Sequence, residues 1–335
     1  MKAIINDRIL GCLTGGAAGD ALGYAVEFSG YDSIISEYGK DGITAYSLSA
    51  ASGKALISDD TQMTLFTAEG LLKQEGKKKN NIYKSYLNWF KTQNCSFEEY
   101  EGDGKSHLMT QKELFARRAP GLTCLSALAS NNAGGVYNPI NNSKGCGGVM
   151  RVAPIAFLQC DAQEGDLLAA EASAITHGHN LGFLPSALLV HIIRKAIYEN
   201  SGDRSLKEII TESVEQIGTQ FAAFEYFDDM ISLVQKSVSL SENGKSDIEN
   251  IRALGEGWVA EETLAIAVYC SLRHSGDFAA TIKAAVNHSG DSDSTGAVAG
   301  NIAGAYLGDA AIGAHWKDSL ECYDIIKTTA EKFYV

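Results

Sequence analysis

The chain has 335 residues, of which 45% are hydrophobic and 21% are charged, a composition typical of a folded globular protein. Its net charge is −13, from 28 lysines and arginines against 41 aspartates and glutamates. Duplex nucleic acid and anionic membranes require a basic protein surface, so this charge argues against both as the main partner. It remains compatible with a small anionic ligand held at a local site.

The cysteines and the first residues bear on the cellular compartment. The seven cysteines are scattered and form no CxxC pair, which is typical of reduced thiols and not of a disulfide framework or a zinc site. The first stretch, MKAIINDRILGC, is interrupted by Asn6, Asp7 and Arg8 before an apolar core develops, so we expect no secretory signal there. Together these features predict a cytoplasmic protein.

Helical periodicity recurs along the chain, whereas the alternating pattern of a strand is scarce. Amphipathic helical patterns are found at 80–93, 184–200 and 261–274. Polar, glycine-rich stretches lie between the helices at 40–58, 101–112, 130–148 and 241–257. None of these stretches is a long low-complexity linker, so we place no domain boundary. The sequence predicts an all-α fold with one compact domain over residues 1–335.

Two segments carry a glycine at every fourth position. The first has glycines at 11, 15, 19 and 23, and the second has them at 296, 300, 304 and 308. Each glycine inside a helix costs about 1 kcal/mol relative to alanine, so we expect an offsetting close approach of two helix backbones. The second segment opens the most membrane-like window, 296–314, but Asn301 and Asp309 favour a buried helix of a soluble protein.

Two distant segments each set hydroxyl and carboxylate side chains directly before a predicted helix. They are SDDTQMT, with Ser58, Asp59 and Asp60, and GDSDST, with Asp291, Asp293 and Ser294. Capping explains one such residue per helix and a second only marginally. If the four carboxylates converge, they would repel one another unless divalent cations neutralised them, and oxygen ligands suit Mg²⁺ or Mn²⁺. Capping alone and a split metal site are both open at this point.

Six stretches together resemble the ADP-ribosylglycohydrolase family. They are GDALGYAVEF (19–28), SDDTQMT (58–64), GCGGVMRVAPIAF (145–157), ITHGH (175–179), GEGWVAEETLAIAVYC (255–270) and GDSDSTGAVAGNIAGAYLG (290–308). They follow the family's order and span nearly the whole chain. The resemblance implies an all-α single domain whose cleft holds a dinuclear Mg²⁺ or Mn²⁺ centre.

Carried over residue by residue, the resemblance implies two divalent cations, Mg²⁺ or Mn²⁺. The implied ligands are Ser58, Asp59, Asp60, Asp291, Asp293 and Ser294, and the implied catalytic residues are Glu27, Asp59, Asp60 and Asp293. Several family members have threonine at the two serine positions, and either hydroxyl offers an oxygen. On its own, Glu27 resembles a solvated residue after the first helix. The resemblance places it at the mouth of the active site, as a base, an acid or a substrate orienter.

The resemblance also implies contacts with ADP-ribose. The implied contact residues are Glu27, Ser143, Lys144, Gly145, Cys146, Gly147, Gly148, Arg151, His177 and Trp258. Without the resemblance, the glycine-rich loop is either a tight turn or a cradle for a diphosphate, and Trp258 is a core residue. Cys146 as a nucleophile is disfavoured because no partner histidine is suitably spaced. We expect His179 to be structural, whereas Trp258 lines the adenosine pocket by resemblance.

The implied function is removal of ADP-ribose from a modified protein. The favoured linkage is the N-glycosidic bond to arginine. Serine-linked ADP-ribose, O-acetyl-ADP-ribose and poly(ADP-ribose) are alternatives, and so is a non-catalytic ADP-ribose-binding or immunity protein. The expected partners are an ADP-ribosylated protein and ADP-ribose, without nucleic acid or membrane, and the sequence leaves the oligomeric state open.

Overall fold

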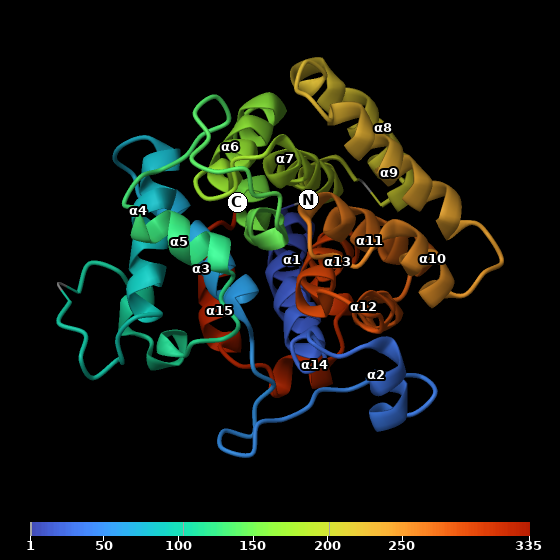
Figure 1. Cartoon of the computed structure of the whole chain (residues 1–335), viewed down its shortest axis with the longest axis horizontal. Helices are drawn as coiled ribbons and strands as arrows, with labels where there is room; N and C mark the ends of the chain where they lie inside the picture. The colour runs from blue at the N-terminus through green and yellow to red at the C-terminus, as the bar shows by residue number, and fades with distance from the viewer. Residues whose placement is uncertain (1, 103, 201) are drawn as a thin grey trace.

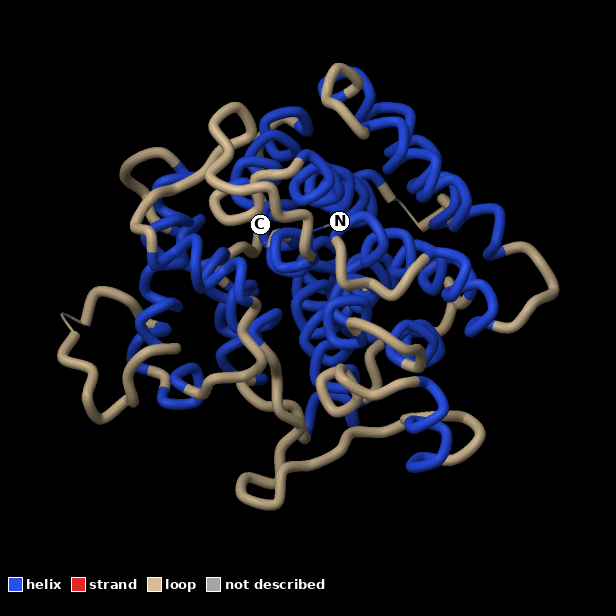
Figure 2. The backbone as a smooth tube through the Cα atoms, in the orientation of Figure 1, coloured by secondary structure: helices blue, strands red, loops and turns tan. Residues whose placement is uncertain are grey.

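The computed structural model describes residues 2–102, 104–200 and 202–335 and consists of helices joined by loops (Figures 1 and 2). The α-helices are α1 (Lys2–Gly23), α2 (Tyr31–Tyr38), α3 (Asp59–Leu72), α4 (Lys78–Thr92), α5 (Leu122–Ala129), α6 (Ala162–Ala174), α7 (Asn180–Arg194), α8 (Leu206–Phe221), α9 (Phe227–Ser241), α10 (Asp247–Leu254), α11 (Ala260–Arg273), α12 (Phe278–Val286), α13 (Ser292–Leu307), α14 (Ala314–Asp318) and α15 (Tyr323–Glu331). Short 3₁₀ or π turns are η1 (Leu108–Thr110), η2 (Lys112–Phe115), η3 (Cys146–Arg151), η4 (Ala153–Phe157), η5 (Lys195–Glu199) and η6 (Asp309–Ala311). Within the described residues no strand forms, only isolated bridges, which confirms the predicted all-α fold.

The two glycine stripes face each other along α1 and α13, which lie together in the middle of the molecule (Figure 1). A Cβ atom on Gly15 would collide with the carbonyl oxygen of Gly300, and one on Gly300 would collide with that of Gly15. The expected close approach of two backbones is therefore confirmed. The side chain of Asn301 is buried here and donates to the carbonyl oxygen of Cys12 at 2.8 Å.

The direction of these two helices determines what meets at their ends. Gly11 contacts Gly304, whereas Gly23 contacts the carbonyl group of Ser292, so the helices run antiparallel. The C-terminal end of α1 thus lies against the N-terminal end of α13. The residues just after α1 are thereby brought to the second acidic cluster.

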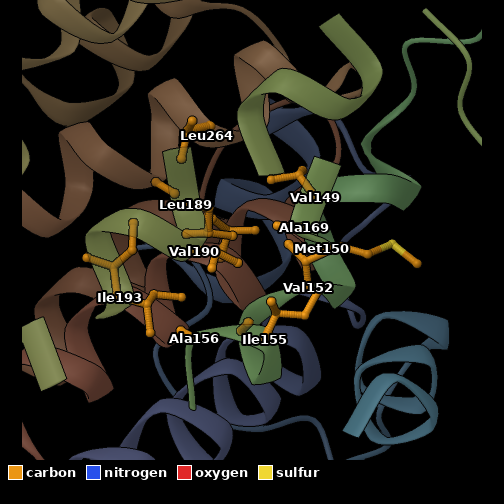
Figure 3. Packing of buried hydrophobic residues seen from close by; sticks show 14 of the residues in the cluster. Val149, Met150, Val152, Ile155, Ala156, Ala169, Leu189, Val190, Ile193 and Leu264 are labelled. Atoms are coloured by element: carbon orange, nitrogen blue, oxygen red, sulfur yellow. The ribbon is translucent and has the colours of Figure 1, made fainter. Parts of the chain in front are cut away.

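The core beside this pair is apolar and continuous. Figure 3 shows part of it, where side chains of η3, η4, α6, α7 and α11 converge. One described helix, Asn180–Glu199, is long and apolar enough to cross a membrane, but 89% of its apolar window is buried inside the protein. Core helices of soluble proteins share these properties. The window 296–314 singled out above instead holds the buried helix α13, which ends before Gly308.

Candidate active site

Both acidic clusters open into one cavity of about 420 Å³. Its lining includes Glu27, Asp59, Asp60, Gly145, Cys146, Gly147, His177, Trp258, Asp291, Asp293 and Ser294, all of which were candidates from the sequence. Segments far apart along the chain therefore meet at the end of the α1–α13 pair. Capping alone does not explain this convergence, although both clusters also cap their helices.

The first cluster forms the N-terminus of α3. The Ser58 hydroxyl caps the helix by accepting from the backbone N–H of Asp60 at 3.2 Å. One carboxylate oxygen of Asp59 accepts from the N–H of Gly121 at 3.3 Å. Both aspartates are nearly fully buried, and one oxygen of Asp60 has no hydrogen-bond partner among the described residues.

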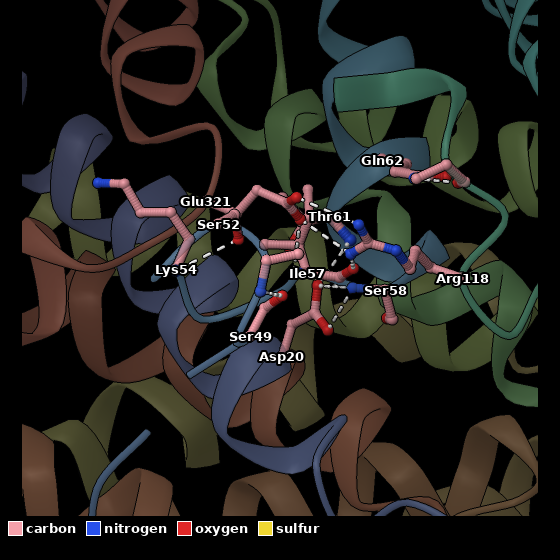
Figure 4. A network of polar contacts seen from close by, with 12 residues as sticks. Asp20, Ser49, Ser52, Lys54, Ile57, Ser58, Thr61, Gln62, Arg118 and Glu321 are labelled. Atoms are coloured by element: carbon pink, nitrogen blue, oxygen red, sulfur yellow. Dashed lines mark hydrogen bonds and ion pairs between the residues drawn. The ribbon is translucent and has the colours of Figure 1, made fainter. Parts of the chain in front are cut away.

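Asp20 holds the start of α3 in place, a role that the sequence did not suggest. This residue of α1 is fully buried and accepts from the backbone N–H of Ser58 at 3.0 Å and of Thr61 at 3.1 Å (Figure 4). Burial and the charge of Asp293 raise the pKa of Asp20 to about 7. A charged residue beside a glycine stripe was the one feature of the sequence that could have indicated it.

An ion pair secures the same segment from the other side. The guanidinium of Arg118 donates to both carboxylate oxygens of Glu321, at 3.0 and 3.2 Å. Glu321 also accepts from the N–H of Ile57 at 3.1 Å, and the carbonyl oxygen of Arg118 accepts from the N–H of Asp59 at 3.1 Å (Figure 4). The start of α3 is therefore held by segments that are distant in sequence.

The second cluster forms the N-terminus of α13. The N–H of Ser294 donates to Asp293 at 2.9 Å and to Asp291, the N-cap, at 3.3 Å. The thiol of Cys146 donates to the other oxygen of Asp291 at 2.7 Å. Burial and neighbouring carboxylates raise the pKa of Cys146 well above its usual value, so its sulfur is a protonated donor and not a nucleophile.

Glu27 joins this cluster and is not solvated. It lies in the turn after α1, only 7% exposed, and offers a ligand atom within 4.8 Å of those of Asp291 and Asp293. Its Oε2 atom has no hydrogen-bond partner among the described residues. Burial, followed by the charges of Asp293 and Asp291, raises the pKa of Glu27 to about 10.

The chemistry of this donor set fits divalent cations. Burial and the neighbouring carboxylates also raise the pKa values of Asp59, Asp60 and Asp291 well above their usual range. Buried carboxylates that repel one another, with oxygen atoms left without partners, are the ligands that Mg²⁺ and Mn²⁺ prefer. The number of cations and their identity stay predictions.

The glycine-rich loop forms the neighbouring wall. The N–H of Cys146 donates to the carbonyl oxygen of Trp258 at 3.2 Å, which ties the loop to the segment before α11. A Cβ atom on Gly147 would lie 3.0 Å from the ring of His177, so this ring packs directly against the loop. Burial and the nearby charge of Arg151 lower the pKa of His177 to about 3, which keeps the imidazole neutral.

Several residues expected at the site do not line the cavity. They are Ser58, expected as a metal ligand, and Ser143, Lys144, Gly148 and Arg151, expected as substrate contacts. Arg151 is fully buried, stacks on Tyr86 at 4.3 Å and donates to the hydroxyl of Thr176 at 2.7 Å. The prediction that Arg151 contacts substrate is corrected, since the turn η3 directs its side chain into the core.

Exposed apolar side chains surround the mouth of the cavity. Trp258 is 41% exposed, so the interpretation as a core residue was wrong, and its ring stacks on that of Phe28 with centroids 6.2 Å apart. Phe28 and Leu122 are 76% and 81% exposed and were both missed. The position of Phe28 next to Glu27 could have indicated it. His179 is structural, as expected, because its ring accepts from the N–H of Leu181 at the start of α7.

Comparisons with known proteins agree with this picture. The model of the family described as ADP-ribosylglycohydrolase matches residues 1–335. ADP-ribosylhydrolase ARH3 of Gallus gallus is 25% identical, and the alignment covers 98% of this chain and 92% of the relative; for ARH3 of Mus musculus the values are 24%, 98% and 91%. A solved structure named "ADP-ribosylglycohydrolase-related protein complex" covers 99% of this chain and 98% of its own, with a TM-score of 0.66 and 24% identity, and shares the fold.

Proposed function

Because this chain belongs to the ADP-ribosylglycohydrolase family, we propose that it hydrolyses the glycosidic bond between ADP-ribose and a modified side chain. The observation that carries the proposal is the convergence of two distant acidic clusters and Glu27 in one open cavity. A buried group of carboxylates is unfavourable for folding, so its presence in an accessible cavity favours a catalytic use.

Two divalent cations, Mg²⁺ or Mn²⁺, are proposed as cofactors. Asp59 and Asp60 on α3, with Asp291 and Asp293 at the start of α13, would hold them, and the hydroxyls of Ser58 and Ser294 would complete the set. A divalent cation at such a site polarises substrate oxygen atoms and lowers the pKa of water.

Glu27 is proposed as the residue that transfers a proton during hydrolysis of the glycosidic bond. One carboxylate oxygen of Glu27 lies within 4.8 Å of oxygens of Asp291 and Asp293, and its Oε2 atom has no hydrogen-bond partner among the described residues. The raised pKa keeps a proton on this carboxyl group until the neighbouring charges are neutralised. Glu27 can then exchange a proton with the attacking water or with the leaving group.

The glycine-rich loop is proposed to hold the diphosphate. Gly145 and Gly147 line the same cavity. Backbone N–H groups of such a glycine-rich loop can donate to phosphate oxygens. The neutral ring of His177, packed against the loop, adds one hydrogen bond without a charge. Substrate would therefore lie between the loop and the two acidic helix ends.

Arginine is retained as the proposed linkage. No lysine or arginine is among the described residues that line the cavity. With the four aspartates holding cations, the carboxylate of Glu27 remains to favour a cationic leaving group such as guanidinium. The names of the ARH3 relatives reported above do not specify a linkage. Serine-linked ADP-ribose, O-acetyl-ADP-ribose and poly(ADP-ribose) therefore belong in the same test.

The test incubates the protein and Mg²⁺ or Mn²⁺ with the arginine-linked substrate and with each of these three alternatives, and measures the release of free ADP-ribose. We expect release that stops with chelator and in Asp293→Asn. No release from any substrate would contradict the hydrolase proposal. Tight binding of ADP-ribose without release would instead support the alternative of a binding or immunity protein.

A further inference from the structure

The aromatic pair at the cavity mouth is the feature that the proposed chemistry leaves without a use. Phe28 and Trp258 come from distant segments, yet their rings are nearly parallel, at 20°. Phe28 leaves three quarters of its surface exposed to water. An exposed aromatic pair at the mouth of a polar cavity is unfavourable in water unless a ligand covers it.

The surroundings of the pair indicate which ligand it suits. Phe28 directly follows Glu27, and a Cβ atom on Gly257, just before Trp258, would lie 3.5 Å from the side chain of Asp291. Phe28 and Trp258 line the same cavity as the carboxylates, and none of its described lining residues is lysine or arginine. Aromatic faces beside a carboxylate favour a planar cation, which stacks on the rings while its N–H groups donate to the carboxylate of Glu27.

We propose that Phe28 and Trp258 form an aromatic clamp that selects substrates whose leaving group is a planar cation, the guanidinium of a modified arginine. The inference rests on the proposed function and deepens it, because it assigns linkage specificity to two residues. The adenine base is the other planar group of the substrate. As a neutral ring it gains nothing from the adjacent Glu27, so the clamp is assigned to the leaving group.

The backbone holds the clamp in position without using the catalytic groups. The carbonyl oxygen of Trp258 accepts from the N–H of Cys146, and the backbone of Val259 pairs with Gly145. On the other side, the turn that carries Phe28 is closed by the N–H of Ser29, which donates to the carbonyl oxygen of Val26 at 2.8 Å. The two rings are therefore presented on fixed segments, and the ring of Phe28 can be changed without disturbing a buried contact.

The experiment uses Phe28→Leu, which keeps an apolar side chain and removes the aromatic face. With the metal-loaded protein, we expect KM for an arginine-linked substrate to rise about tenfold, while kcat changes little. The inhibition constant of free ADP-ribose should stay unchanged, because the product lacks the guanidinium. The matched control is Tyr137→Leu, a similarly exposed aromatic residue that does not line the cavity and should leave KM unchanged.

Three results would overturn the clamp. The first is an unchanged KM in Phe28→Leu. The second is a loss of affinity for free ADP-ribose in Phe28→Leu as large as the rise in KM, which would assign the rings to adenine. The third is a preference of the wild-type protein for the serine-linked substrate.

A second readout does not require turnover. Trp89 and Trp316 are buried, so free arginine should quench the fluorescence of exposed Trp258, while lysine, a non-planar cation, should quench it less.

This readout separates the two proposals. If no substrate is hydrolysed but arginine still quenches Trp258 and Phe28→Leu abolishes the quenching, the clamp stands and the hydrolase proposal fails. If ADP-ribose is released while arginine and lysine quench equally, the hydrolase proposal stands and the clamp fails.

Discussion

The α1–α13 interface and the cavity at its end are built in opposite ways. Along the interface, glycines such as Gly15 and Gly300 let two backbones touch. In the cavity, carboxylates that raise one another's pKa are packed together, and Oε2 of Glu27 has no hydrogen-bond partner among the described residues. The interface stabilises the fold by packing, whereas the cavity opposes folding by repulsion. Substitutions in the two regions should therefore change stability in opposite directions.

The largest effect is expected from Asp293→Asn. The charge of Asp293 contributes to the raised pKa values of its acidic neighbours, which are Asp20, Glu27, Asp59, Asp60 and Asp291. Without this charge, ADP-ribose release should fall on the order of a thousandfold, since a cation would lose a shared ligand. In chelator, the same change should raise the unfolding free energy by about 1 kcal/mol.

Rate assays test the expected loss of activity in Asp293→Asn, and chemical denaturation in chelator tests the expected gain in stability. The exposed Asp318→Asn is the control and should change neither quantity. A metal-free Asp293→Asn protein less stable than the wild type would remove the contrast between cavity and interface.

The next effect is expected at the interface. In Gly300→Ala, the new methyl group collides with the carbonyl oxygen of Gly15, and overpacking of this kind lowers the unfolding free energy by about 2 kcal/mol. The matched control is Gly218→Ala in α8, where the nearest atom would lie 3.7 Å away, so stability should rise by about 1 kcal/mol. Urea denaturation measures both, and equal shifts in the two variants would refute the packing argument.

A smaller effect is expected from the ion pair that holds the start of α3. Arg118→Gln removes the donor to Glu321 and should weaken Mn²⁺ binding about tenfold, because Asp59 is held through the same segment. Arg118→Lys should restore part of the affinity. The exposed pair of Lys112 and Glu98 supplies the control, since Lys112→Gln should have no effect. Unchanged Mn²⁺ titrations in Arg118→Gln would show that the pair does not position Asp59.

The smallest effect concerns pH. Burial lowers the pKa of His177 to about 3, against about 6.5 when unfolded, so the unfolded chain binds more protons between these values. The contribution of His177 to stability is therefore complete above pH 6.5 and is lost as the pH falls below it. His177→Gln should remove about 1 kcal/mol of this loss between pH 6.5 and 5.5. Thermal unfolding at several pH values measures this difference. If Tm falls equally with pH in His177→Gln and in the wild type, the buried neutral ring is contradicted.

Patterns within one segment could be predicted from the sequence, whereas contacts between distant segments could not. Spacing and residue type alone indicated the glycine stripes and the two acidic clusters, because each of these patterns lies within a short segment. The pairing of Asp59 and Asp60 with Asp291 and Asp293 stayed open beside capping alone until the family resemblance implied one metal centre. The contacts of Asp20 and Glu321 with the start of α3 could not be predicted, because they join segments that are distant in sequence. Arg151 was misassigned because a loop motif does not indicate which way the following turn directs its side chain.

The central claim is that two helix ends, joined by a glycine interface, form one divalent cation centre. The most direct test is a titration of the metal-free protein with Mn²⁺, in which electron paramagnetic resonance measures the concentration of the free ion. We expect two ions per chain, and the loss of at least one in Asp59→Asn and equally in Asp293→Asn, although these residues belong to different helices. A wild-type protein that binds no Mn²⁺, or either variant binding as many ions as the wild type, would contradict the account.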